Sequence, residues 1–309
     1  MALEVEGSDG KILQWGQGVT CPKCNSLIWP DHGLFASYFQ SGHSQCHRCL
    51  EPFDLWEQSI EFLKWWPGKM GAFQLLGAVV NRFEVDLEAN KTAFVEFTEI
   101  PEGAEIVNVN VMTVGGPDGP VVLPALPLFG ELRWDPFPRQ LRLYGMASAD
   151  TPPPSKIYIA VTWIPPEHEI SVHHLVDAAK QFGAGRFTGV LIPANVAVEA
   201  ALTPAMDAWI RKYCDPDEAR EFLSLKGATY AQQLKVLTKV GARALRINPL
   251  PAHILAHLAK LLQYRNDLGH KGKLEHPKRK PPDKDKAADL LTAAVFGYHY
   301  ARYFQDAVK

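Results

Sequence analysis

The sequence predicts a multidomain α+β protein in which three stretches of different character follow one another. The first is short and carries two Cys-x-x-Cys pairs, the second alternates apolar and polar residues, and the third repeats apolar residues at steps of three and four. Alternation is typical of half-buried strands, and steps of three and four are typical of amphipathic helices. A chain of 309 residues is long enough for two or three domains of these kinds.

The two cysteine pairs lie near the N-terminus, in CPKC at 21–24 and CHRC at 46–49. Each pair is expected to form a tight turn that aims two thiolates at one point, and two such turns make the tetrahedral four-sulfur site of structural Zn²⁺. The predicted ligands are Cys21, Cys24, Cys46 and Cys49. Nearby histidines could replace a cysteine, although four thiolates need no further ligand; these are His32, His43 and His47.

Residues 17–66, which follow a tail of residues 1–16, resemble a zinc ribbon. The stretch is too short to build a core unaided, so metal binding is expected to supply much of its folding free energy. A closed four-thiolate site favours a structural metal over a catalytic one, because no coordination position is left for substrate or water. The two basic residues Lys23 and Arg48 leave open whether the ribbon binds a nucleic acid or a protein.

Residues 72–165 predict an antiparallel β-sandwich of about six to eight strands. Alternating segments such as FEVDL at 83–87 and KIYIAVTW at 156–163 are separated by turns such as GGPDGP at 115–120. The apolar, proline-broken segment 121–134 is expected to cover a sheet edge or to meet a partner. Because no nucleophile, base or metal ligand clusters here, we interpret the region as a packing or recognition module.

Residues 167–309 predict a bundle of four or five helices, with apolar faces along 195–213, 248–267 and 285–308. Pro204 is expected to kink or split the first of these helices, with Thr203 able to cap a second segment.

Asp215 and Pro216 are expected to cap and begin a further helix.

The formal net charge of −2 gives no global field that would draw the chain to a polyanion, so nucleic acid would need a local basic patch. The N-terminus lacks the pattern of a signal peptide, and the apolar runs are expected to stop short of the ~20 residues that span a bilayer. We therefore expect a cytoplasmic protein that does not bind a membrane. Paired cysteines fit that reducing compartment.

The stretch YRNDLGHKG at 264–272 places an arginine, an amide and a histidine at the end of a predicted helix. Five residues turn through about 140° in a helix, so Arg265 and His270 converge only if the helix ends near Gly269, where glycine favours unwinding. A basic patch follows, with Lys271, Lys273, Lys278, Arg279 and Lys280. A simpler interpretation is a solvated loop, with the cations only capping the helix C-terminus.

These residues resemble the motif of the HEPN superfamily of small helical bundles, whose nuclease members carry Arg-x4-6-His with a polar residue directly after the arginine. Arg265, Asn266 and His270 match that motif, and the resemblance covers roughly residues 167–309. It extends to Glu199, which is similar to the acidic residue that many such nucleases carry in an early helix. The chain departs from the family pattern at Pro204 and in the long basic loop after the motif.

The resemblance implies a metal-independent endoribonuclease that leaves 2',3'-cyclic phosphate and 5'-hydroxyl ends. His270 would take the proton of the RNA 2'-hydroxyl, because the unperturbed pKa of histidine is about 6.5. Arg265 would bind phosphate oxygens with its planar fork and stabilise the charge of the transition state. Asn266 would orient the phosphate or the arginine, and Glu199 would hold the arginine or the imidazole.

The basic patch would bind RNA, and the placement of two HEPN motifs across a dimer cleft implies a homodimer. Toxins and anti-phage defence effectors resemble this architecture, so a regulatory protein partner or another trigger is expected. The alternative is a non-catalytic adaptor that dimerises through its helical domain and binds nucleic acid or protein. A zinc-dependent hydrolase is disfavoured because the four-cysteine site is closed.

Overall fold

The computed structural model describes residues 4–6, 12–14, 19–28, 30–65, 71–88, 91–113, 140–144, 155–166, 169–224, 229–271 and 280–309. The chain forms two compact units. One unit joins Met1–Gly77 to His168–Lys309, and the other is Ala78–Glu167. The N-terminal cysteine-rich segment therefore belongs to the same compact unit as the C-terminal helices.

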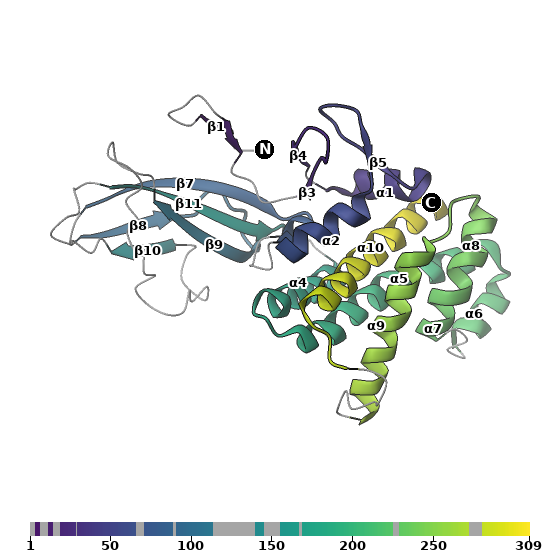
Figure 1. Ribbon diagram of the computed structural model, residues 1–309. Helices are drawn as coiled ribbons and strands as arrows, with labels where there is room; N and C mark the ends of the chain where they lie inside the picture. Colours follow the sequence, from purple (N-terminus) through teal and green to yellow (C-terminus); the bar gives the residue numbers. More distant parts are fainter. Residues whose placement is uncertain are drawn as a thin grey trace. The chain divides into compact units, whose positions relative to one another are not determined.

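The unit Ala78–Glu167 contains two antiparallel sheets among its described residues (Figure 1). Strand β11 lies between β7 and β9 in a three-stranded sheet, and β10 pairs with β8 in a second sheet. The strands are β7 (Val79–Leu87), β8 (Thr92–Glu96), β9 (Glu105–Thr113), β10 (Gln140–Tyr144) and β11 (Ser155–Ile164).

Side chains from both sheets share one buried cluster, made of Val95, Phe97, Ile100, Leu141, Leu143, Ile159, Val161 and Trp163. Inward side chains alternate along β11, where Ile159, Val161 and Trp163 are two residues apart, as period two requires. The described residues of this unit hold five strands, against the six to eight predicted, and the apolar segment 121–134 lies outside them.

The N-terminal part of the other unit contains short strands and three helices. Its strands are β1 (Glu4–Glu6), β2 (Ile12–Gln14), β3 (Val19–Thr20), β4 (Leu27–Ile28), β5 (Ser44–Gln45) and β6 (Pro52–Phe53). Its helices are α1 (His32–Ser41), α2 (Leu55–Trp65) and α3 (Gly71–Gln74). Asp31 caps α1 by accepting a hydrogen bond from the Leu34 amide, and Gly42 ends the helix with φ of 80°.

The C-terminal part is helical, as predicted. Its elements are α4 (Ile170–Gly183), the 3-10 turn η1 (Phe187–Val190), α5 (Leu191–Tyr213), α6 (Pro216–Ser224), α7 (Tyr230–Gln232), the π-helical turn η2 (Gln233–Leu237), α8 (Thr238–Leu245), α9 (Ala252–Lys271) and α10 (Lys284–Val308). Asp215 accepts a hydrogen bond from the Asp217 amide and so caps α6, which confirms the predicted start of that helix.

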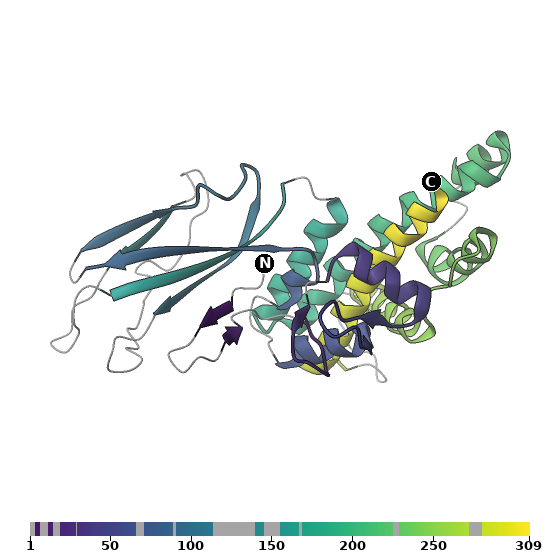
Figure 2. The same ribbon diagram turned by 90° about the horizontal axis from the view of Figure 1, so that it is seen from above.

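Helix α10 is the centre of this unit. From Ala287 to Ala301, every residue except Asp289 is buried, so the helix is covered on all sides and not on one face alone. Helices α4, α5 and α9 pack against it, and so do the N-terminal helices α1 and α2, which lie beside α10 in both views (Figures 1 and 2). The additional contacts from α1 and α2 explain why so few residues of α10 are exposed to solvent.

The expectation that Pro204 splits its helix is wrong, because α5 runs unbroken from Leu191 to Tyr213. Pro204 lies on the exposed side of α5, where water can hydrogen-bond to the backbone carbonyl that its missing N–H leaves unpaired. The residues on the buried side hold the helix against α10. Thr203 caps no second segment, and its hydroxyl donates to the side-chain oxygen of Gln233 (3.1 Å).

Helix α5 with its leading turn, Phe187–Tyr213, is also long and apolar enough to cross a membrane by length and composition alone. This corrects the expectation that every apolar run stops short of that length. In the structure, 56% of its most apolar window is buried within the protein. Packing in the bundle accounts for its apolar residues.

Candidate functional site

The four predicted cysteine ligands converge in the structure. Their Sγ atoms all lie within 4.8 Å of one another. The Sγ atoms of Cys21 and Cys49 are 3.6 Å apart, and those of Cys24 and Cys46 are 3.7 Å apart. A tetrahedron with Zn–S bonds of about 2.3 Å has edges of about 3.8 Å. The cluster therefore fits a tetrahedral metal ion such as Zn²⁺ with little rearrangement.

The two Cys-x-x-Cys turns have the same backbone geometry. The carbonyl of Cys21 accepts a hydrogen bond from the Asn25 amide, and the carbonyl of Cys46 accepts one from the Leu50 amide, each at 2.9 Å. Asn25 and Leu50 both have positive φ, 54° and 59°. Asparagine tolerates this left-handed conformation, whereas leucine adopts it at a steric cost. The second turn is therefore strained at Leu50.

Hydrogen bonds favour the thiolate form of Cys24 and Cys46, whereas burial and the neighbouring thiols raise the pKa of Cys49 to about 12. The hydroxyl of Ser26 lies 2.9 Å from Cys24 Sγ and 3.3 Å from Cys46 Sγ. The Ser26 hydroxyl is the main cause of the lowered pKa of Cys24. Burial raises the pKa of Cys46, but hydrogen bonds from Ser26 and from the Cys49 and Arg48 amides outweigh it and lower that pKa to about 6. A low thiol pKa suits metal ligands, because the thiolate is the form that binds.

Helices α1 and α2 attach this segment to the bundle through aromatic contacts. The ring of Phe35 stacks on that of His299 with centroids 3.7 Å apart and planes at 8°. The hydroxyl of Tyr38 lies 3.2 Å from His253 Nε2, and Trp56 lies beside the same imidazole with centroids 5.2 Å apart. The four-cysteine segment is thus packed into the core that contains α10.

His299 is buried at the centre of this contact. Its Nε2 donates to the Leu75 carbonyl (3.2 Å), and no partner for its Nδ1 occurs among the described residues. Burial lowers the pKa of His299 to about 3, because the charged imidazolium would lose its hydration. The imidazole is therefore neutral near pH 7 and acts as a packing residue.

Arg265 and Asn266, the first two residues of the predicted motif, lie on α9. Both are half-buried, and Arg265 Nη1 donates to Asn266 Oδ1 (3.3 Å). No carboxylate in the described part of the chain pairs with the Arg265 guanidinium. An arginine without an acidic partner keeps its charge and most of its donors for a ligand.

The condition for Arg265 and His270 to converge, a helix end near Gly269, is not met, because α9 continues two residues further to Lys271. Glycine inside a helix costs only about 1 kcal/mol, so it permits an end but does not impose one. Positions 265 and 270 therefore stay about 140° apart around one continuous helix. The side chains of His270 and Lys271 lie outside the described residues, and so do Lys273, Lys278 and Arg279.

Glu199 lies on α5, half-buried and close to Tyr230. The pKa of Tyr230 is raised, first by the burial of the phenol and then by the Glu199 charge. The hydroxyl of Tyr230 is buried and has no hydrogen-bond partner among the described residues.

The position of Glu199 along the axis of the bundle can be judged from its neighbour Val198. Val198 and Leu258 both lie against Gly297, within 3.0 and 3.1 Å of where a β-carbon would stand. Arg265 is seven residues beyond Leu258 on α9, which is about 10 Å along the helix axis. A role of Glu199 beside Arg265 therefore stays a prediction.

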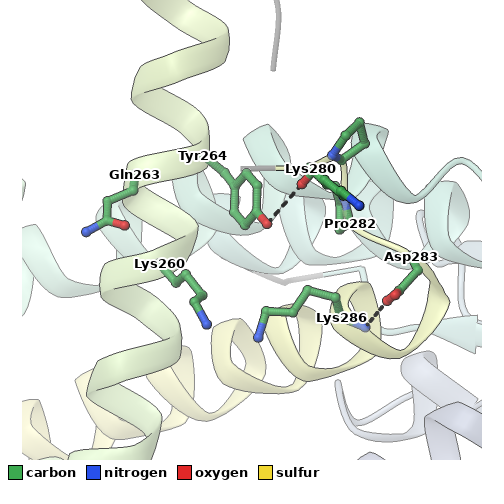
Figure 3. A pocket seen from close by; sticks show the side chains of 8 residues that line it. Lys260, Gln263, Tyr264, Lys280, Pro282, Asp283 and Lys286 are labelled. Carbon is green, nitrogen blue, oxygen red and sulfur yellow. Dashed lines mark hydrogen bonds between the residues drawn. The ribbon is translucent and has the colours of Figure 1, made fainter. Parts of the chain in front are cut away.

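A cavity of about 480 Å³ lies between α9 and the start of α10 (Figure 3). Its lining includes Tyr264, the residue before Arg265 in the sequence. Lys280, predicted from the sequence to bind RNA, lines it. Lys260 and Gln263 also line it, and sequence reasoning missed both. The spacing on the helix was a signal that could have found them, because Lys260 is three residues before Gln263 and four before Tyr264, and residues three to four apart share a helix face.

No family model, curated protein or solved structure matches this chain. Its own geometry shows a four-cysteine cluster near the N-terminus, with Sγ atoms placed as a metal site such as zinc requires. It also shows a helical C-terminal region that carries the Arg265–Asn266 pair.

Proposed function

We propose that the protein is a metal-independent endoribonuclease of the HEPN type, with a structural zinc ribbon and a β-sandwich joined to its helical bundle. The observation that carries the proposal is the half-buried Arg265, which is hydrogen-bonded to Asn266 and has no carboxylate partner in the described residues. The planar guanidinium group of an arginine binds phosphate oxygens bidentately. His270 follows on the same helix.

In the proposed reaction, His270 takes the proton of the RNA 2'-hydroxyl as its oxygen attacks the adjacent phosphorus. The bond between phosphorus and the 5'-oxygen breaks, the 5'-oxygen takes up a proton, and a 2',3'-cyclic phosphate remains. Arg265 stabilises the charge on the pentavalent phosphorus, and Asn266 holds the arginine in place through the observed hydrogen bond. The basic residues after the motif bind the RNA backbone.

The geometry of α9 supports the homodimer that we propose. Positions 265 and 270 lie about 140° apart around one continuous helix, which favours a site shared by two chains over a site built within one chain. Two chains that meet along this part of α9 can pair the arginine of one protomer with the histidine of its partner. The proposed effector role, with a protein partner or other trigger, rests on the resemblance to toxins and anti-phage proteins.

The test is RNA cleavage by zinc-loaded protein in buffer freed of Mg²⁺, since a strong chelator would also attack the four-cysteine site. His270→Ala should lower the rate by about 10²–10⁴, the usual worth of a positioned general base. Arg265→Ala should lower it by about 10²–10³. Arg243→Ala, on the exposed surface of α8, is the matched control and should keep full activity. Full activity of the His270→Ala protein would refute the mechanism.

Mixing the two inactive variants tests the dimer. If the site is composite, heterodimers of Arg265→Ala and His270→Ala chains carry one site with both groups and regain part of the activity. If each chain holds a complete site, the mixture stays inactive. A strictly monomeric protein that still cleaves RNA would contradict the composite site.

The same geometry of α9 also fits the alternative, a non-catalytic adaptor that dimerises through its helical domain. The continuous helix separates positions 265 and 270, which suits two independent surface contacts as well as it suits one active site. An adaptor would bind nucleic acid or protein with no change in the covalent structure of the RNA, and both variants would affect binding alone.

A further inference from the structure

The cavity between α9 and α10 is built from three chain segments of one compact unit. Helix α9 gives Lys260, Gln263 and Tyr264; the segment before α10 gives Lys280, Pro281 and Pro282; and the α10 cap and first turn give Asp283 and Lys286. The Tyr264 hydroxyl donates to the Lys280 carbonyl (3.3 Å), which ties the segment before α10 to α9 (Figure 3).

Three lysines surround this cavity with little acidic compensation. Figure 3 shows the side chains of Lys260 and Lys286 extending towards each other from the two helices. Within the described residues, Lys260 pairs with no carboxylate. Asp283, the acidic residue of the lining, is already engaged, because its Oδ1 accepts a hydrogen bond from the Lys286 amide (2.9 Å).

The ion pair of Lys286 is shared. Asp289 Oδ2 lies 3.7 Å from Lys286 Nζ, but Oδ1 of the same carboxylate lies 3.4 Å from Lys64 Nζ. The Lys286 side chain is 24% exposed, and its pKa is lowered by burial first and by the neighbouring Lys260 next. Like charges held together at a half-buried position are stabilised by an anion placed between them.

The cavity is larger than a single inorganic anion needs. Its volume of about 480 Å³ lies in the range of small-molecule sites, roughly 300–1,000 Å³. Its walls combine the lysines with apolar surface from Pro281, Pro282 and the ring of Tyr264. This combination suits a ligand with an anionic group at one end and a flat or apolar body at the other.

We propose that this cavity binds a phosphate-bearing ligand of about the size of one nucleotide, with the phosphate between Lys260, Lys280 and Lys286. The same chemistry has two sources, a nucleotide unit within an RNA chain or a free nucleotide. The RNA source rests on the proposed function, with the cavity holding one nucleotide unit of the bound chain. The free-nucleotide source is independent of it.

The experiment measures binding of two probes to the full-length, zinc-loaded protein. One is a short fluorescent RNA with 2'-O-methyl groups throughout, which 2'-hydroxyl chemistry cannot cleave, and the other is adenosine monophosphate. Lys260→Gln and Lys286→Gln remove one charge each and should weaken binding about tenfold or more, as the loss of a hydrogen bond to a charged group does.

Lys239→Gln is the matched control. Lys239 is exposed on α8, and α8 packs near Phe304, eighteen residues or about 27 Å further along α10 than Lys286. It should bind both probes as the unmodified protein does. RNA binding that adenosine monophosphate does not compete with assigns the RNA source, and direct binding of adenosine monophosphate assigns the free nucleotide.

The proposal is overturned if neither probe binds, if the two cavity variants bind as tightly as the unmodified protein, or if Lys239→Gln weakens binding equally. Because the RNA probe cannot be cleaved, this outcome is separate from the test of catalysis. Cavity-dependent binding together with full cleavage by the His270→Ala protein would keep the cavity assignment and reject the proposed mechanism.

Discussion

Phe35→Ala should destabilise the helical bundle although Phe35 belongs to the N-terminal segment. Its side chain is fully buried, stacked on His299 and in edge contact with Phe296 (4.9 Å between centroids), and both partners lie on α10. Truncation of a core phenylalanine to alanine typically costs about 3–5 kcal/mol. For a unit of 150–250 residues, each kcal/mol shifts Tm by about 2–4 °C, so the expected loss is about 6–20 °C.

The assay is thermal unfolding together with hydrogen exchange of the α10 amides. Phe35→Ala should lower both the Tm of the helical unit and the protection of α10. Phe97→Ala is the matched control, because Phe97 is equally buried but lies in the core of the other unit. It should lower the protection of β11 and leave α10 unchanged. Unchanged α10 protection in Phe35→Ala would refute the shared core.

The remaining predictions concern the four-cysteine cluster and the buried histidine. Purified protein should carry one zinc ion per chain by elemental analysis, and Cys46→Ser should lower zinc content and α10 protection together; full zinc occupancy in that variant would exclude the four-thiolate site. Leu50→Gly should stabilise the protein by about 1 kcal/mol, since Leu50 is 64% exposed and has positive φ, whereas Asn25→Gly should have little effect in the same denaturant titration. The free energy of unfolding should fall with acidification from about pH 6.5 towards pH 3, by up to about 1.4 kcal/mol per pH unit. In that window His299 binds a proton in the unfolded chain but not in the folded protein, where its pKa is about 3. His299→Phe should flatten that slope in denaturant titrations at several pH values, and an unchanged slope would show that other groups cause it.

Local sequence signals predicted the features that depend on a few neighbouring residues. The Cys-x-x-Cys spacing encodes two turns that each aim a pair of thiolates, and the structure confirms that the pairs meet. Asp215 before Pro216 predicted a helix start that the structure contains, because a cap acts within one turn. An apolar repeat of two residues predicted strands and a repeat of three to four residues predicted helices, and these patterns also depend only on neighbouring residues.

Features set by distant contacts could not be predicted in this way. The burial of α10 on all sides depends on α1 and α2, more than two hundred residues earlier in the chain. Pro204 is a local signal that packing overrode, since α5 continues through it, and Gly269 permits a helix end without imposing one, so α9 continues to Lys271. The lysine cavity joins positions 260 and 286, which no short motif connects.

The most direct test of the proposed function uses an RNA with a single 2'-deoxy nucleotide at a mapped cut site, zinc-loaded protein and no added divalent metal. We predict that cleavage stops at the deoxy position, continues at other sites, and leaves 2',3'-cyclic phosphate and 5'-hydroxyl ends. Cleavage that persists at the deoxy position, or that appears only after Mg²⁺ is added, would contradict the use of the 2'-hydroxyl by His270 and Arg265.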